Sequence, residues 1–290
     1  MENIYICTII SKKEQRLNRK IISSLKNLKN LKAINLKFII LLNGLNSFEI
    51  PLSKKKFILI KSVKKKIPEA RNLILKKLRS LNFDYAGFVD DDCFFKTDWM
   101  IEHLSFLKSH KKVDIVSGPQ LSYPKSLFHK LLEPNFKHNQ NLKWCPTNNV
   151  FFKSSILKRT KYIFDEKLNN IGGSDQLFFL QINNAGFKII WNKKNPVYEY
   201  QNKDRLKFKW FVNRNIRYGY SGYFIDKKAF GTFIGTTCSI LKFFYYLVCS
   251  CCNLLLSPFN FKIYLLTSIQ YLARSLGRIK AFFFKHDKYV

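Results

Sequence analysis

The residues Tyr85–Asp92, YAGFVDDD, carry the clearest indication of architecture in this chain. Tyr85–Val89 is an apolar segment with the length of a buried strand, and three consecutive aspartates follow it at once. Adjacent carboxylates repel one another, so the stretch costs stability unless a cation offsets the charge. Mg²⁺ and Mn²⁺ take oxygen ligands and often bind through one or two carboxylates plus substrate phosphates. The stretch therefore indicates a metal–phosphate site or, alternatively, a solvated acidic turn.

The segments before Tyr85 alternate between strand and helix patterns. Apolar runs predict strands at Ile4–Ile10, Leu36–Leu42 and Phe57–Ile60, and the first of these is too short for a signal peptide. A helical pattern separates the first two runs, and Pro68 begins a second helix over Pro68–Leu81. This alternation predicts an α/β domain with a mostly parallel sheet, in which ligands bind at the carboxyl ends of the strands.

The segments after Asp92 continue the alternation as far as a basic stretch. We expect, in order, a helix at Thr97–Ser109, a strand at Val113–Ser117, a loop-rich stretch at Pro119–Pro146, a strand at Val150–Phe152, a helix from Asp175, strands at Lys188–Trp191 and Val197–Tyr200, and a basic helix at Arg205–Tyr218.

The last 64 residues differ in composition from the rest. Phe230–Leu256 is an apolar run broken only by Lys242, and it is long enough to span a bilayer. Phe261–Phe284 mixes apolar and basic residues, as a helix lying on a membrane surface does. The alternative is a pair of buried helices packed on the preceding domain. We expect one domain over 1–226 and a hydrophobic, basic, helical tail over 227–290.

The net charge of +32 suggests a partner of opposite charge, either nucleic acid or an anionic membrane. Most of the basic residues are Lys, which the codon usage of an AT-rich genome explains equally well. No helix-turn-helix, RNA-binding or zinc signature appears, so we expect no nucleic-acid partner. Of the 19 acidic residues, 14 lie between 81 and 226, which makes that region the place to search for chemistry.

The seven Cys residues have neither the spacing of a disulfide framework nor that of a zinc site. Cys249, Cys251 and Cys252 lie in the apolar run, where Cys behaves as a small hydrophobic residue. We therefore expect reduced thiols in a cytosolic setting.

Several short motifs occur in a fixed order along residues 3–225. They are LLNG (Leu41–Gly44), ARN (Ala70–Asn72), DDD (Asp90–Asp92), TDW (Thr97–Trp99), PTNNVFF (Pro146–Phe152), GGSD (Gly172–Asp175), AGFKIIW (Ala185–Trp191) and VYE (Val197–Glu199). Together they resemble the family 2 glycosyltransferases, which are inverting enzymes of the GT-A fold with nucleotide-sugar donors. The stretch from VYEY to RNIRYG resembles the exopolysaccharide branch, of the succinoglycan-glucosyltransferase type.

The resemblance implies roles for the donor-binding residues. Asn43 falls where the family contacts the base or ribose of the donor, and Arg71 falls on its nucleotide-binding arginine. Asp90 and Asp92 match the D-x-D motif, which holds the donor diphosphate through Mg²⁺ or Mn²⁺. Asp91 lies between them and is grouped with the nucleotide-sugar site.

The resemblance also implies a general base and an acceptor site. Asp175 matches the aspartate that removes a proton from the acceptor hydroxyl. Glu199 stands where many relatives have a metal-proximal His, and we include it among the metal-ligand candidates. Trp191, Arg214 and Arg217 are candidates for contacts with the acceptor or a phosphate.

Two departures from the family pattern are relevant. Ser174 replaces a Glu beside Asp175, and Asn43 stands where other members have Asp. Because Ser174 replaces that Glu, a transferase fold without catalytic activity is one alternative. Because the net charge is so positive, a polybasic protein that binds membranes or nucleic acid is another.

The resulting hypothesis is a metal-dependent hexosyltransferase of cell-surface polysaccharide synthesis. Its donor would be a nucleotide sugar, with UDP-sugars first, and its acceptor a saccharide or a lipid-linked saccharide. It would act on an anionic membrane, at the cytoplasmic face of the inner membrane of a bacterium with an AT-rich genome.

Overall fold

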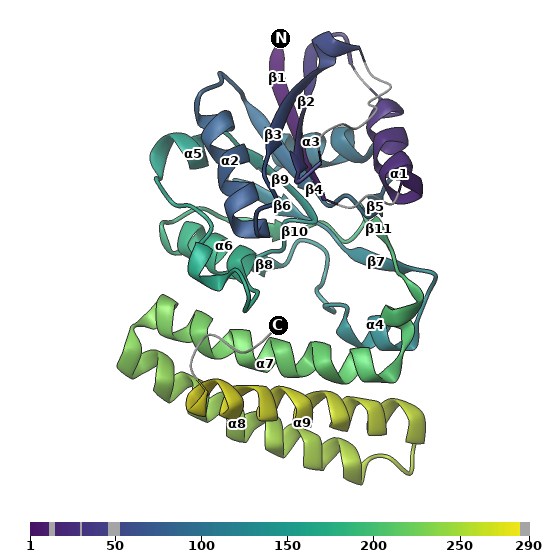
Figure 1. The fold of residues 1–290 in the computed structure, drawn as a ribbon, viewed down its shortest axis with the longest axis vertical. Helices are drawn as coiled ribbons and strands as arrows, with labels where there is room; N and C mark the ends of the chain where they lie inside the picture. Colours follow the sequence, from purple (N-terminus) through teal and green to yellow (C-terminus); the bar gives the residue numbers. More distant parts are fainter. Residues whose placement is uncertain (12–14, 30, 46–52, 285–290) are drawn as a thin grey trace.

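The computed structural model describes residues 1–11, 15–29, 31–45 and 53–284, and its main element is a sheet of eight strands (Figure 1). The strand order is β3-β2-β1-β4-β9-β6-β10-β8. The bounds are β1 Glu2–Ile10, β2 Ile34–Asn43, β3 Phe57–Ser62, β4 Tyr85–Val89, β6 Ile115–Ser117, β8 Asn141–Leu142, β9 Asn149–Lys153 and β10 Ile189–Trp191.

The first four strands run parallel, as the alternation of strands and helices predicts. Strand β9 is antiparallel to both β4 and β6, β10 is parallel to β6, and β8 is an antiparallel edge strand. The sheet is therefore mixed but mostly parallel, and the predicted α/β class is confirmed. The carboxyl ends of β1, β2 and β4 point to one edge, where Asp90–Asp92 follow β4.

Helices cover both faces of this sheet (Figure 1). Their bounds are α1 Gln15–Lys26, α2 Ile67–Arg79, α3 Trp99–Ser109, α5 Ser155–Arg159 and α6 Ser174–Asn184. On one side, Ile4 and Ile6 of β1 are buried with residues of α1 and α3. On the other, Tyr5 and Cys7 are buried with residues of α2, α5 and α6. Successive strand residues point to opposite faces, so a strand that is apolar at nearly every position needs cover on both.

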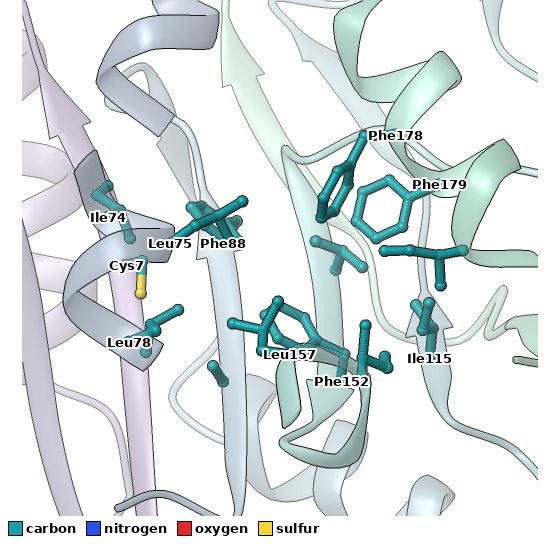
Figure 2. Close-up of a cluster of buried hydrophobic side chains, with 14 of the residues drawn as sticks. Cys7, Ile74, Leu75, Leu78, Phe88, Ile115, Phe152, Leu157, Phe178 and Phe179 are labelled. Carbon is teal, nitrogen blue, oxygen red and sulfur yellow. The ribbon is translucent and has the colours of Figure 1, made fainter. Parts of the chain in front are cut away.

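Helix α2 packs through one stripe of its surface. Ile74, Leu75 and Leu78 pack toward Cys7 and Phe88 on the sheet, as Figure 2 shows. These positions recur at helical spacing, and proline occupies the first turn, where its missing N–H costs nothing. This packing fixes the direction of the helix and with it the position of Arg71 one turn from its start.

Helix α6 is anchored in the same core. Phe178 and Phe179 of this helix pack toward Ile115 of β6 and Phe152 of β9 (Figure 2). Their burial fixes the first turn of α6, which carries Asp175. The candidate base is thus attached to a rigid element.

A second sheet of three strands lies beside the first. It consists of β5 Cys93–Phe94, β11 Val197–Tyr200 and β7 Gln120–Tyr123, in the order β5-β11-β7. The Pro119–Pro146 stretch, expected to be rich in loops, thus holds β7, β8 and the short helix α4 Leu127–Leu132. These elements have two to six residues, which is too few for a periodic pattern. The two strands pair with β10 and β11, which lie far along the chain.

Three long helices form a layer beneath the sheet domain (Figure 1). They are α7 Phe208–Phe230, α8 Thr232–Leu255 and α9 Phe261–Phe283, and α7 lies between the domain and the other two. Helix α7 continues without a break through residues 226 and 227. At Gly219 of α7 an added β-carbon would overlap the carbonyl of Arg274, and at Gly277 of α9 one would overlap that of Ile216. The backbones of α7 and α9 therefore approach each other directly.

Polar groups join the helices inside this layer. Asp226 of α7 accepts hydrogen bonds from Arg278 of α9 at 2.8 Å and from Lys242 of α8 at 2.7 Å. Both Asp226 and Arg278 are only 5% exposed. Ser250 and Ser268 donate to each other's carbonyl oxygens at 3.0 and 2.9 Å. Buried charges need partners, so this network ties the three helices to one another.

The opposite surface of α8 is apolar and exposed. Leu241, Phe244, Tyr245 and Val248 are each more than half exposed and recur at helical spacing. In the part of the chain that the structure describes, α8 is the one helix with the length and composition to cross a membrane, and 11% of its apolar window is buried. In α8 the large apolar residues face outward and small polar residues face the other helices, which is the reverse of the arrangement in a helix of a soluble protein.

The seven cysteines are free in the structure.

Candidate active site

A cavity of about 950 Å³ lies between the carboxyl ends of the strands and the helical layer. Its lining includes Asp90, Asp91, Asp92, Asp175 and Glu199. These carboxylates come from residues up to about 110 positions apart, and the fold places them around one space of the size that ligand pockets have.

Asp90 follows the last residue of β4 and faces Arg71 of α2. The distance from Arg71 Nη2 to Asp90 Oδ1 is 3.8 Å. The pKa of Asp90 is raised above its ordinary value by desolvation, and neighbouring carboxylates, Asp92 first, add to this, while Arg71 opposes it. A second cation would stabilise the ionised form of Asp90.

Asp91 joins the ends of two strands. Its Oδ2 accepts a hydrogen bond from the backbone N–H of Ser11, the residue after β1, at 3.1 Å. The side chain thereby fixes the β1 and β4 ends relative to each other, while it also lines the cavity.

Asp92 and Glu199 meet through strand pairing. Strand β5 places Cys93 opposite Glu199 of β11, so the side chain of Glu199 lies near Asp92. Nη1 of Arg205, in the short helix η3 Lys203–Leu206, lies 2.6 Å from Glu199 Oε1 and 3.8 Å from Asp92 Oδ2. Gln201 donates to the other oxygen of Glu199 at 2.6 Å. Burial, followed by the charge of Asp92, raises the pKa of Glu199.

Asp175 lies in the first turn of α6, after two glycines with positive φ. Gly172 has φ of +92° and Gly173 of +80°, which a residue with a β-carbon rarely adopts. A β-carbon at Gly173 would also overlap the side chain of Ile225. Oδ1 of Asp175 accepts from the Gln176 backbone at 2.9 Å and Asp175 lines the cavity. The glycine pair thus permits α6 to begin against α7.

Ser174, the residue that replaces the family's Glu, is 4% exposed. It is buried at the start of α6, so Asp175 is the acid that this turn presents to the cavity.

Asn43 is placed differently from the other predicted residues. It is 4% exposed, and its amide donates to the Lys65 carbonyl at 2.9 Å and accepts from the Lys65 N–H at 2.7 Å. Both bonds connect the end of β2 to the segment before α2, and Asn43 lies outside the cavity lining. Its contact with a nucleotide stays a prediction.

Three tryptophans line the cavity to different degrees. Trp191 at the end of β10 is 2% exposed and packs edge-on against Phe136, so it belongs mainly to the core. Trp144 is 37% exposed, and Trp210 stacks on His129 at 4.6 Å. Trp144 and Trp210 therefore offer the cavity more aromatic surface than Trp191.

Arg214 and Arg217 of α7 line the cavity, and Arg274 of α9 lines it with them; contact of Arg214 and Arg217 with an acceptor or a phosphate stays a prediction. Arg217 donates from Nε to the Ile171 carbonyl at 3.2 Å, which places it beside the turn that leads to Asp175.

The carboxylates suit a divalent cation that shares its ligands with a substrate. Among the described residues no group of three or more His, Cys, Asp or Glu side chains is close enough to enclose a metal ion. Asp92 and Glu199 supply hard oxygen ligands at one point, and a cation bound there would complete its shell with donor phosphates. The residues therefore fit Mg²⁺ or Mn²⁺ in the presence of a diphosphate.

Some cavity residues escape analysis of the sequence. Arg205 lies in the stretch that resembles the exopolysaccharide branch, but no role was predicted for it, and its closeness to Glu199 in the chain was the available signal. Lys242 is the one cation that interrupts the apolar run Phe230–Leu256, and that interruption was a usable signal, whereas Arg274 lies in a segment with several other basic residues.

Comparison with known proteins gives matches at the level of structure. Neither a protein-family model nor a curated protein matches the sequence. A mannosyltransferase from Pyrobaculum calidifontis, PcManGT, solved with GDP-Man and Mn²⁺, is similar with a TM-score of 0.61 at 11% identity. The similarity covers 97% of this chain and 87% of that one.

Residues 1–349 of S. aureus TarS match with a TM-score of 0.52 at 15% identity. The match covers 78% of this chain, and this chain spans 64% of the length of that structure. At such identities a likeness establishes the fold. The chain has the α/β GT-A glycosyltransferase fold, followed by a layer of three helices.

Proposed function

We propose that the protein is an inverting, metal-dependent family 2 glycosyltransferase of cell-surface polysaccharide synthesis, with a hexose nucleotide as donor. The observation that carries the proposal is the single cavity in which Arg71, Asp90, Asp92 and Asp175 meet on a glycosyltransferase fold. The first two carboxylates follow a parallel strand, and the third lies in the first turn of α6.

In this mechanism the carboxylate of Asp175 accepts the proton of an acceptor hydroxyl. The hydroxyl oxygen forms a bond to the anomeric carbon as the bond from that carbon to the nucleoside diphosphate breaks, on the opposite face of the sugar. Inversion follows from this geometry. Asp92 and Glu199 would hold a divalent cation, which when bound neutralises the charge of the leaving diphosphate.

The donor half of the cavity supports a nucleotide sugar. Arg71 lies beside Asp90, at the carboxyl end of β4, where α/β folds bind nucleotides. UDP-sugars are the first donors to test, and GDP-sugars come next because PcManGT was solved with GDP-Man.

We further infer that α8 and α9 lie along an anionic membrane and do not cross it. Asp226 holds Lys242 of α8 and Arg278 of α9 against α7. To cross the bilayer, α8 would have to leave this network and uncover buried charges. The exposed apolar stripe of α8 can enter the interface while the network stays intact. A lipid-linked acceptor at the cytoplasmic face of a bacterial inner membrane fits this arrangement.

The test is a donor screen on the 290-residue chain in detergent. Release of nucleoside diphosphate and sugar transfer are measured across UDP-, GDP- and TDP-hexoses with Mn²⁺ or Mg²⁺. We expect turnover with one donor class that chelation of the metal removes. Binding of a donor without any turnover would indicate the degenerate fold, and absence of donor binding would overturn the proposal.

A further inference from the structure

Two arginines converge on one aromatic ring in the wall of the cavity, and a third lines the same cavity. The guanidinium carbon of Arg214 lies 4.8 Å from the ring centre of Tyr218, and that of Arg274 lies 5.7 Å from the same centre. Arg217, also on α7, reaches the Ile171 carbonyl on the same wall. We call Arg214, Arg217 and Arg274 the arginine cluster.

Among the described residues, no carboxylate pairs directly with this cluster, although the pKa of Arg214 is raised, against the effect of burial, by Tyr218 and then by the more distant charges of Glu199 and Asp175. In the described parts of the chain, none of the three side chains takes part in an ion pair, whereas Arg71, Arg205 and Arg278 each face a carboxylate. Repulsion is already felt inside the cluster, since burial and then the positive charge of Arg214 lower the pKa of Arg217. A cluster of like charges on a concave surface is stabilised by an anionic ligand.

One arginine of the cluster lies beside the turn that leads to the candidate base. An added β-carbon on Gly172 would lie 3.2 Å from Nε of Arg217, so this arginine touches the turn that precedes Asp175. The donor side has its own cations, Arg71 at Asp90 and Arg205 at Asp92. An anion on the cluster would therefore lie beside the turn that leads to the candidate base.

The cluster also belongs to the helical layer. Arg274 comes from α9 and is oriented by its Nε donating to Asn215 Oδ1 of α7 at 3.0 Å. The outer surface of the same layer exposes Leu272 and Leu276 of α9. A ligand with a charged head and an apolar tail would find both surfaces within one three-helix layer.

Given the proposed function, on which this inference rests, we propose that the arginine cluster binds the phosphate or diphosphate of a lipid-linked acceptor. Guanidinium groups bind phosphate oxygens in pairs of parallel hydrogen bonds, which three of them can supply from two helices. The phosphate would then fix the acceptor with its sugar hydroxyl toward Asp175, and the lipid would follow the layer toward the membrane.

The test measures binding of farnesyl diphosphate, farnesol and inorganic pyrophosphate to the 290-residue chain in detergent micelles. It compares the wild type with Arg274→Gln and Arg217→Gln, and it uses Lys209→Gln, an exposed charge on α7, as the control. Affinities for UDP and GDP with Mn²⁺ are measured on every variant. Arg274→Lys tests whether positive charge alone restores binding.

We expect farnesyl diphosphate to bind about tenfold more tightly than farnesol or pyrophosphate, and each Gln variant to lose about tenfold. Nucleotide affinity should stay within twofold of the wild type in all variants. Loss of nucleotide affinity in the Gln variants would assign the cluster to the donor and overturn the proposal. Equal binding of pyrophosphate and farnesyl diphosphate, or no effect of the Gln substitutions, would overturn it too.

Failure of the proposed function gives a separate result. In that case the wild type binds neither UDP nor GDP, whatever it does with farnesyl diphosphate. Folding of each variant is checked by its unfolding temperature. If Arg274→Gln does not fold, the binding measurements on Arg217→Gln decide the test.

Discussion

Arg205 Nη1 lies 2.6 Å from Glu199 Oε1, in the place where the D-x-D carboxylates approach strand β11. The same nitrogen lies 3.8 Å from Asp92 Oδ2. The positive charge of Arg205 thus offsets the negative charges of Glu199 and Asp92, the two carboxylates that suit a divalent cation. A metal with its diphosphate and this guanidinium compete for the same oxygens, so donor binding should displace Arg205.

Replacing Arg205 by Ala should therefore strengthen metal binding. With UDP or GDP present, we expect the apparent Mn²⁺ affinity of Arg205→Ala to be severalfold higher than that of the wild type, because the metal no longer has to displace the guanidinium from its carboxylates. The affinity of Arg205→Lys should lie between those of the wild type and Arg205→Ala. Calorimetric titration with Mn²⁺ measures this. Lys207→Ala, which breaks an exposed pair with Asp204, is the matched control. Weaker Mn²⁺ binding to Arg205→Ala would mean that Arg205 assists the donor instead.

Asp175→Asn should separate chemistry from donor binding. Loss of the general base is expected to lower the transfer rate by about 10²- to 10⁴-fold, while the affinity for nucleoside diphosphate stays the same. Steady-state transfer and nucleotide titration on the same preparation check this. Asp98→Asn, at the start of α3 and without a side-chain cap bond, is the control. Full activity in Asp175→Asn would exclude Asp175 as the base.

Asp226→Ala should destabilise the helical layer. Removing this carboxylate leaves Arg278 buried without its partner and frees Lys242, and breaking a buried pair in this way costs about 3–5 kcal/mol. Denaturant unfolding in detergent, followed by circular dichroism, measures the change. Asp204→Ala, an exposed carboxylate, should change stability far less. Adding Arg278→Met to Asp226→Ala should recover part of the loss, and no recovery would show that burial of Arg278 is not the cause.

Stability should fall as the pH drops from about 6.5 to 4 because of His103. This side chain is fully buried against Phe151, and burial lowers its pKa to about 4. Between the two pKa values the unfolded chain binds a proton that the folded chain does not, so lowering the pH favours unfolding. The full effect is about 3 kcal/mol, present above pH 6.5 and lost by pH 4.

His103→Gln isolates this contribution, because Gln cannot titrate and can still donate to Asn149 Oδ1, which lies 3.0 Å from the histidine ring. We expect the difference in unfolding free energy between wild type and variant to shrink steadily over that pH range. A difference independent of pH would show that His103 titrates normally in the folded protein.

The outer stripe of α8 should control binding to lipid. Leu241→Glu combined with Val248→Glu places two charges among exposed apolar residues, and we expect binding to phosphatidylglycerol vesicles to fall at least about tenfold. Co-sedimentation measures it. Val63→Glu, an exposed position that follows β3 and lies outside α8, should bind as the wild type does. Unchanged binding of the double variant would remove α8 from the membrane contact.

Much of the fold could be predicted because it follows from local patterns. Ile4 and Cys7 lie in a run that is apolar on both sides, which requires cover on both faces of a sheet. Pro68 marks the first turn of α2, and Asp90 marks the end of β4. The antiparallel direction of β9 could not be predicted, because the hydrophobic pattern of a short apolar strand is the same whether the strand pairs in parallel or antiparallel.

The candidate site divides in the same way. The sequence by itself determined which residues stand at strand ends and helix starts, and so it singled out Asp90, Asp92 and Asp175. Only the tertiary structure decided their partners. Arg205 reaches Asp92 through β5–β11 pairing, and Arg274 joins Arg214 through the contact of α9 with α7. Strand and helix patterns arise from neighbours within a few residues, whereas charge partners depend on how distant elements pack, and no local pattern records that packing.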